Sequence, residues 1–160
     1  MYGDEFAIIL GVFAIIIFGG MITVAVFYCL TLQRTLEAVS PENRKMPPAN
    51  VWLLFIPIFN WVWHFIIVNN VADSLKAEFE RRGIKPDEER PGYGIGLAAS
   101  ICWCTSWIPG LNALTGLAAL ICWIIYWSKI SGYKNQLGSG GTTNIGSPKK
   151  HTDILDNPNF

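Results

Sequence analysis

Residues 6–32 read FAIILGVFAIIIFGGMITVAVFYCLTL, an apolar run that contains no Asp, Glu, Lys or Arg. A helix needs about 20 consecutive apolar residues to cross a bilayer, and this run is longer. The preceding residues, 1–5, are acidic, whereas a secretory signal starts with a basic segment and ends at a small-residue cleavage site. We therefore expect an uncleaved transmembrane helix in an integral membrane protein.

Two further runs, residues 51–72 and 92–128, also lack charged side chains. The second is too long for one simple span, and Pro109 and Gly110 divide it, because Pro followed by Gly suits the centre of a type II turn. The pattern predicts an all-α, polytopic membrane bundle over residues 1–137. Its four transmembrane helices are expected near residues 6–32, 50–72, 92–108 and 111–130.

Composition agrees with this class of protein. Only 15% of the 160 residues are charged, against about 25% in an average soluble domain. The formal net charge is zero, so nothing draws the whole chain to nucleic acid, and the expected surroundings are a lipid bilayer. Residues 138–160 change to Gly, Ser, Thr and Asn, which predicts a disordered cytoplasmic tail.

The second predicted helix starts at Asn50 and contains Pro57, which should kink or break it. Beyond the apolar run, Glu78 and Arg82 are spaced to pair on one helix face. A helix from residue 50 to 82 would be about 50 Å long, which exceeds the roughly 30 Å hydrocarbon core. We therefore expect its charged end to extend into the cytoplasm.

Lys and Arg counts beside the spans predict orientation. With four spans, the second loop and the tail carry nine of these residues, against three in the first loop. Both termini are then expected in the cytoplasm. The alternative is a re-entrant second helix hinged at Pro57, which would place all 12 basic residues in the cytoplasm and the N-terminus outside.

Asn60 and His64 lie four residues apart, on one helix face with Pro57. Polar groups inside a membrane usually face the bundle, where they mark pathways or bond a neighbouring helix. This face could form a proton relay, a substrate contact or an axial haem ligand. It could equally hydrogen-bond only to a neighbouring helix.

Gly92, Gly96, Ser100 and Cys104 form a ridge of small residues at i, i+4 spacing, which permits close helix packing within or between chains. The cysteines show no local pair of metal ligands, so we expect no metal site. Phosphate-binding loops, nucleophile elbows and zinc-protease motifs are also absent from the sequence. The expectation is a protein without enzymatic activity or a resident cofactor.

Three segments, residues 41–46 (PENRKM), 52–60 (WLLFIPIFN) and 74–79 (SLKAEF), resemble a group of small bacterial membrane proteins classed as domains of unknown function. The likeness covers roughly residues 34–137. It implies a compact helical bundle in the bacterial cytoplasmic (inner) membrane.

Three functions remain open at this point. The first is a non-enzymatic accessory component that binds another membrane protein or a second copy of itself through the small-residue ridge. The second is a small oligomeric transporter or channel component that uses the Pro57, Asn60 and His64 face. The third is a haem-binding subunit.

Overall fold

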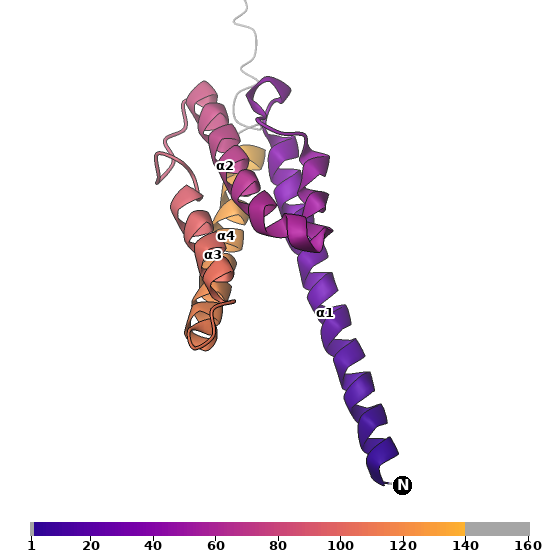
Figure 1. Ribbon diagram of the computed structural model, residues 1–160. Helices are drawn as coiled ribbons and strands as arrows, with labels where there is room; N and C mark the ends of the chain where they lie inside the picture. The colour runs from indigo at the N-terminus through magenta and orange to yellow at the C-terminus, as the bar shows by residue number, and fades with distance from the viewer. Residues whose placement is uncertain (1, 140–160) are drawn as a thin grey trace, which may run out of the picture.

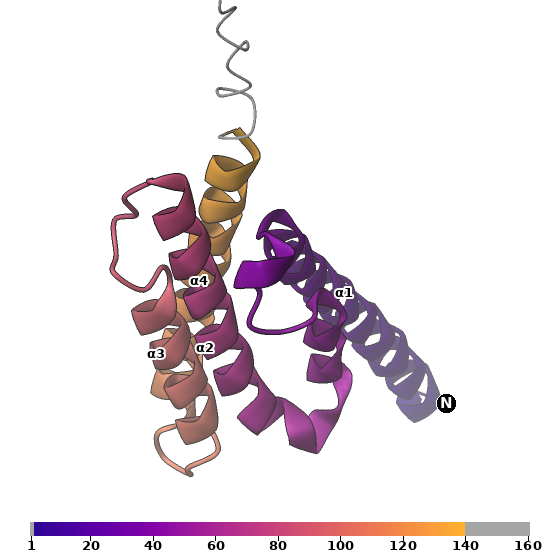
Figure 2. The ribbon, with the colours of Figure 1, turned by 90° about the horizontal axis from the view of Figure 1, so that it is seen from above.

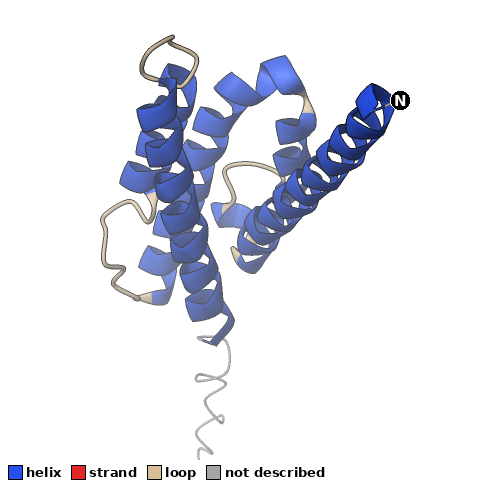
Figure 3. Ribbon diagram, turned by 90° about the horizontal axis from the view of Figure 1, so that it is seen from below, coloured by secondary structure: helices blue, strands red, loops and turns tan. Residues whose placement is uncertain are grey.

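The computed structural model describes residues 2–139, which are helical apart from short connections (Figures 1 and 3). Four α-helices and two 3-10 helices follow one another: α1 (Tyr2–Ala38), η1 (Pro41–Asn43), η2 (Pro48–Phe55), α2 (Pro57–Arg82), α3 (Tyr93–Thr105) and α4 (Asn112–Ser139). The prediction of an all-α fold is confirmed over these residues. The predicted tail lies outside them, except for residues 138 and 139, which belong to α4.

Within the described residues, two helices, not four, are long and apolar enough to cross a membrane. They are α4 and the segment Glu5–Ala38 of α1. Helix α3 has 13 residues, or about 20 Å at 1.5 Å per residue, which is short of the hydrocarbon core. The predicted span at residues 92–108 is therefore too long by several residues.

The predicted helix from Asn50 is broken and not kinked at Pro57, so the second of the two outcomes expected of this proline is the one observed. Residues 48–55 form η2, and α2 begins at Pro57. Proline disfavours the helical conformation in the residue before it, and Ile56 is indeed extended (φ −84°, ψ 111°). Pro57 then occupies the first turn of α2, where its missing N–H costs nothing.

The chain reverses at this break, because η2 descends beside α1 and α2 climbs back (Figure 1). The first residue of α1 consequently lies at the end of the molecule opposite the last residue of α4. This reversal is the geometry of the re-entrant alternative, whereas the side of a membrane on which each terminus lies stays a prediction.

Viewed along the bundle, α2, α3 and α4 form one group, and α1 stands apart with η2 on its flank (Figure 2). The first half of α1 projects beyond the group, and its apolar side chains, such as Ile15 at 73%, are exposed (Figure 1). The second half packs against α4 and η2. The site described below is lined by residues of both groups.

The buried core lies toward the charged end of the molecule. Side chains from α1, α2 and α4 fill it, among them Leu36, Val71, Leu75, Phe79 and Ile130. Val71, Leu75 and Phe79 continue the face of α2 that carries His64, so this face points into the bundle. At the other end of the bundle, Gly110 (φ 92°) forms the turn between α3 and α4, with the Leu111 N–H donating to the Ile108 carbonyl at 3.2 Å.

Candidate functional site

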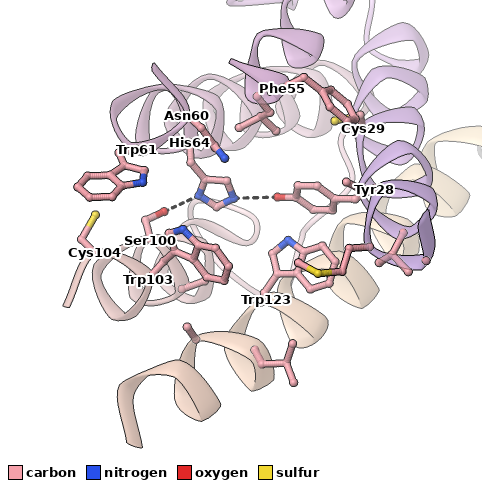
Figure 4. A pocket seen from close by; sticks show the side chains of 18 residues that line it. Tyr28, Cys29, Phe55, Asn60, Trp61, His64, Ser100, Trp103, Cys104 and Trp123 are labelled. Carbon is pink, nitrogen blue, oxygen red and sulfur yellow. Dashed lines mark hydrogen bonds between the residues drawn. The ribbon is translucent and has the colours of Figure 1, made fainter. Parts of the chain in front are cut away.

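A cavity of about 610 Å³ lies between the middle of α1 and the helices α2, α3 and α4. Every element from α1 to α4 except η1 contributes to its wall, and most of the lining side chains are apolar. Among the residues that the structure describes, no Asp, Glu, Lys or Arg lines it. Asn60 and His64 of α2 meet there with Tyr28 of α1 and Ser100 of α3 (Figure 4). The face predicted from the spacing of Asn60 and His64 is thus the polar part of an otherwise apolar cavity.

His64 is held between two neighbouring helices. Its Nε2 lies 3.1 Å from the Tyr28 hydroxyl, and its Nδ1 lies 2.7 Å from Ser100 Oγ (Figure 4). Ser100 Oγ is also 2.9 Å from the carbonyl oxygen of Gly96, to which it donates. Three helices are therefore joined by one continuous chain of hydrogen bonds.

The number of available protons determines which group donates in each of these hydrogen bonds. If Tyr28 donates to Nε2, then Nδ1–H donates to Ser100 and the Ser100 hydroxyl donates to Gly96, so every proton has an acceptor. In the reverse direction the buried Tyr28 hydroxyl would have no acceptor among the described residues. An unpaired buried donor costs about 1–3 kcal/mol, which favours the first arrangement.

We expect neutral His64 to carry its proton on Nδ1. Nitrogen-15 NMR of protein labelled in the histidine rings separates protonated from bare ring nitrogens, and a His151→Gln background leaves one ring to observe. Ser100→Ala should shift the population toward the Nε2–H form by removing the Nδ1 acceptor, whereas Tyr28→Phe should keep Nδ1 protonated. A wild-type ring protonated on Nε2 would contradict this assignment.

Both ring nitrogens of His64 are already hydrogen-bonded, which limits the ability of His64 to bind a ligand. A haem iron would have to displace either Tyr28 or Ser100 to reach the ring. The geometry therefore favours the hypothesis that His64 bonds neighbouring helices over the hypothesis that it is an axial ligand.

Asn60 differs from His64 in having a free side chain. Its amide lies beside the His64 ring in the cavity, half-buried, and forms no hydrogen bond with the residues that the structure describes (Figure 4). An amide offers two donors and an acceptor. Asn60 thus offers a molecule in the cavity both a donor and an acceptor. Pro57, predicted on the same face, does not line the cavity and instead starts α2.

The predicted small-residue ridge lies inside the chain. A Cβ built on Gly96 would come within 2.7 Å of the Tyr126 ring and 2.8 Å of Val68, and one on Gly92 within 3.2 Å of Ile130. Ser100 is buried in the hydrogen-bonded chain, and Cys104 lines the cavity. The ridge lets α3 approach α2 and α4, so it does not present a surface to another protein.

A second polar cluster closes the charged end of the bundle. The fully buried Glu78 carboxylate accepts hydrogen bonds from the Ser40 N–H, the Asn43 amide and Arg82 Nε, at 3.1, 2.8 and 2.6 Å. Arg81 adds a second charged donor at 2.7 Å. We call these five residues the Glu78 cluster.

Arg82 extends the Glu78 cluster to two helix ends. Its guanidinium donates to the carbonyls of Ala38 in α1 and Leu137 in α4, at 3.2 and 2.7 Å. Carbonyls in the last turn of a helix lack partners within the helix, so a cation there is favourable. The cluster thereby joins the C-terminal ends of α1, α2 and α4.

The electrostatics of Glu78 follow from these contacts. Burial raises the pKa of the carboxyl, but the hydrogen bonds from Arg81, Asn43, Arg82 and the Ser40 N–H outweigh burial and hold the pKa well below its ordinary value of 4.5. Glu78 is therefore ionised at neutral pH. The pair with Arg82 was predicted from spacing, but its burial was not.

The domain of unknown function DUF4328 matches residues 1–124. The chain belongs to the DUF4328 family. Its matched part includes α1, α2, α3 and the first half of α4, which together hold all four polar residues of the cavity. No curated protein and no solved structure matches the chain.

Two of the segments on which the resemblance rested meet in this DUF4328 protein. Asn43 donates to Glu78, and the Lys45 N–H donates to Ser74 Oγ at 2.9 Å. Residues 41–46 and 74–79 thus face each other at the charged end of the bundle. The DUF4328 match begins at residue 1, whereas the resemblance was placed from residue 34 onward.

Tyr28 and the Ser100 hydroxyl are site residues that the sequence did not indicate as partners of His64. Each lies 36 residues from His64, and neither forms a local motif with it. The available signal was their polarity within apolar runs, but Thr23 and Thr105 share that property and only bond to their own helices. Three-dimensional contact was needed to select the correct pair.

Proposed function

We propose that this DUF4328 protein is a multi-pass membrane protein that binds an apolar, lipid-derived molecule in the cavity between α1 and the other helices. The observation that carries the proposal is the cavity itself, whose apolar wall holds the amide of Asn60, which has no hydrogen-bond partner in residues 2–139. Pockets of about 300–1,000 Å³ with mostly apolar walls and a few polar groups are typical ligand sites. The proposed role is binding and not catalysis.

Membrane placement is supported by the exposed apolar side chains of α1 and by the distribution of charge. All ten Lys and Arg residues that the structure describes lie in the last turns of α1, in the charged half of α2, in the loops that adjoin these segments, or toward the end of α4. Those segments share one end of the molecule (Figure 1). The bias of Lys and Arg toward cytoplasmic loops then favours a bacterial inner-membrane orientation with this end inside and the start of α1 outside.

The orientation is testable with epitope tags. In spheroplasts of a bacterial host, external protease should remove a tag placed before Met1 and spare one placed after Phe160. Detergent lysis should make both tags sensitive, which controls for accessibility. Protection of both tags in intact spheroplasts would restore the four-span arrangement with both termini inside.

Gly20 provides a test of the cavity as a binding site. Gly20 lines the cavity, its neighbour Gly19 does not, and a Cβ at either position meets no other atom within 4 Å. Gly20→Phe should therefore fill the cavity without disturbing α1, and Gly19→Phe is the matched control. Native mass spectrometry from lipid nanodiscs should show lipid retained by wild type and Gly19→Phe, and several-fold less retained by Gly20→Phe.

Two results would contradict the binding proposal. One is a wild-type protein that retains no lipid, and the other is equal retention by both phenylalanine variants.

The hypothesis of a protein partner loses its main argument, because the small-residue ridge is used within the chain. It now rests on the exposed half of α1. The transporter hypothesis gains support, because the cavity includes the face of Asn60 and His64 on which it was based. Ligand binding is the part of that hypothesis that the geometry favours.

A further inference from the structure

We propose that the cavity selects a neutral lipid whose head carries a hydroxyl group, such as a monoacylglycerol, and rejects lipids with a charged head. This inference rests on the proposed function, because it concerns the class of molecule that the same cavity binds. It follows from the charge of the wall, from the saturation of His64 and from the free amide of Asn60.

The first step is the charge of the wall. Phosphate, carboxylate or ammonium heads need a counter-charge when they leave water, because burying an unpaired ion is costly. None of the side chains that line the cavity is Asp, Glu, Lys or Arg. The basic residues that the structure describes lie toward the far end of the bundle, where Arg81 and Arg82 are paired with Glu78. A charged head in the cavity would therefore have no ionic partner.

The second step concerns which polar groups can contact a head group. Both ring nitrogens of His64 are occupied, and the Ser100 hydroxyl both accepts from Nδ1 and donates to Gly96. A ligand that bonded to His64, or that accepted from the Ser100 hydroxyl, would break an existing hydrogen bond. The Asn60 amide can be contacted without such a loss, because it has no partner among the described residues.

The third step is the chemistry of that amide. Asn60 presents N–H donors and a carbonyl acceptor on one planar group. A hydroxyl can accept from the amide nitrogen and donate to the amide oxygen, so it satisfies both. An ester or ketone head can only accept, and it would leave the Asn60 oxygen unpaired. A hydroxyl head on an apolar chain is therefore the best complement to this cavity.

The experiment compares three probes that share a 9,10-dibromostearoyl chain, whose bromines quench tryptophan fluorescence. The probes are the 1-monoacylglycerol, the corresponding lysophosphatidic acid and the methyl ester. Trp61, Trp103 and Trp123 line the cavity and report on its occupant (Figure 4). Protein in phosphatidylcholine nanodiscs is titrated with each probe, and quenching that is absent from Gly20→Phe is assigned to the cavity.

We expect the monoacylglycerol to half-saturate the cavity at a concentration at least tenfold below that of its phosphate, with the methyl ester between them. Asn60→Leu, of similar size, should retain chain binding but bring the monoacylglycerol and methyl ester to equal affinity. Asn60→Asp places a charge in the cavity and should weaken all three probes.

The outcomes separate the two proposals. Equal or tighter binding of the phosphate, or an unchanged preference in Asn60→Leu, would overturn the inference about the head group and leave the binding function intact. If no probe gives saturable quenching that depends on Gly20, both the binding function and this inference fail.

Discussion

Glu78→Gln is expected to lower the free energy of unfolding by about 3 kcal/mol. Removing one partner of a buried ion pair costs about 3–5 kcal/mol, because the remaining charge is left uncompensated. We expect a cost at the low end of this range, because the side chain of Arg82 is 22% exposed and that of Arg81 is 49% exposed. Water can therefore partly replace the carboxylate. Unfolding in mixed micelles, followed by tryptophan fluorescence, measures the loss.

Glu80→Gln is the matched control for this substitution. It removes the same charge two residues later in α2, where the exposed side chain forms no ion pair with the described residues. Its effect should stay within about 0.5 kcal/mol. Equal destabilisation by both variants would mean that net charge, and not the Glu78 cluster, stabilises this end of the bundle.

The pH dependence of the wild type provides an independent check on Glu78. Its folded-state pKa lies below the ordinary value of 4.5, so its contribution to stability is fully present above that value. The contribution is lost as pH falls through the lower, folded-state pKa. The difference in stability between wild type and Glu78→Gln should therefore be constant from neutral pH to about pH 5 and shrink in stronger acid. A difference that grows on acidification would contradict the assigned direction of the shift.

Local rules predicted the parts of this fold that depend on neighbouring residues. Pro57 indicated a kink or break, because proline constrains itself and the residue before it. The direction of the chain after the break depends on distant contacts, among them the bond from Trp63 Nε1 to the Asn50 carbonyl at 2.8 Å. Such contacts have no sequence signal in a single chain. The break was therefore predictable, whereas the reversal was only one of two alternatives.

The candidate site was also predictable only in the part that depends on neighbouring residues. Asn60 and His64 were predicted to share a face, since residues four apart on a helix always do. Tyr28 comes to His64 from α1 and Ser100 from α3, and only the packing of three helices brings them together. Glu78 and Arg82 were predicted as a pair on an exposed extension of the helix. Glu78 is buried and Arg82 is mostly covered, because the chain after α1 folds over them.

Gly96→Ala tests the packing on which both the fold and the site depend. The added Cβ would lie 2.7 Å from the Tyr126 ring and 2.8 Å from Val68, closer than real contacts allow. Both neighbours are at most 1% exposed and cannot move into solvent, so α3 itself must shift. Overpacking of this kind costs about 1–3 kcal/mol, and we expect a loss of about 3 kcal/mol because a ring and a β-branched side chain are both contacted.

Gly94→Ala, in the same helix, separates this packing effect from helix propensity. A Cβ at Gly94 meets no other atom within 4 Å, so the substitution should be neutral or add up to about 1 kcal/mol through better helix propensity. Gly96→Ala should gain the same propensity and still lose stability. Because Ser100 lies one turn after Gly96, the shift of α3 should also lengthen the bond to His64 and reduce the Nδ1–H signal in the NMR experiment. If Gly96→Ala were as stable as Gly94→Ala and kept that signal, the close approach of α3 to α2 and α4 would be wrong, and the cavity built on it would be wrong as well.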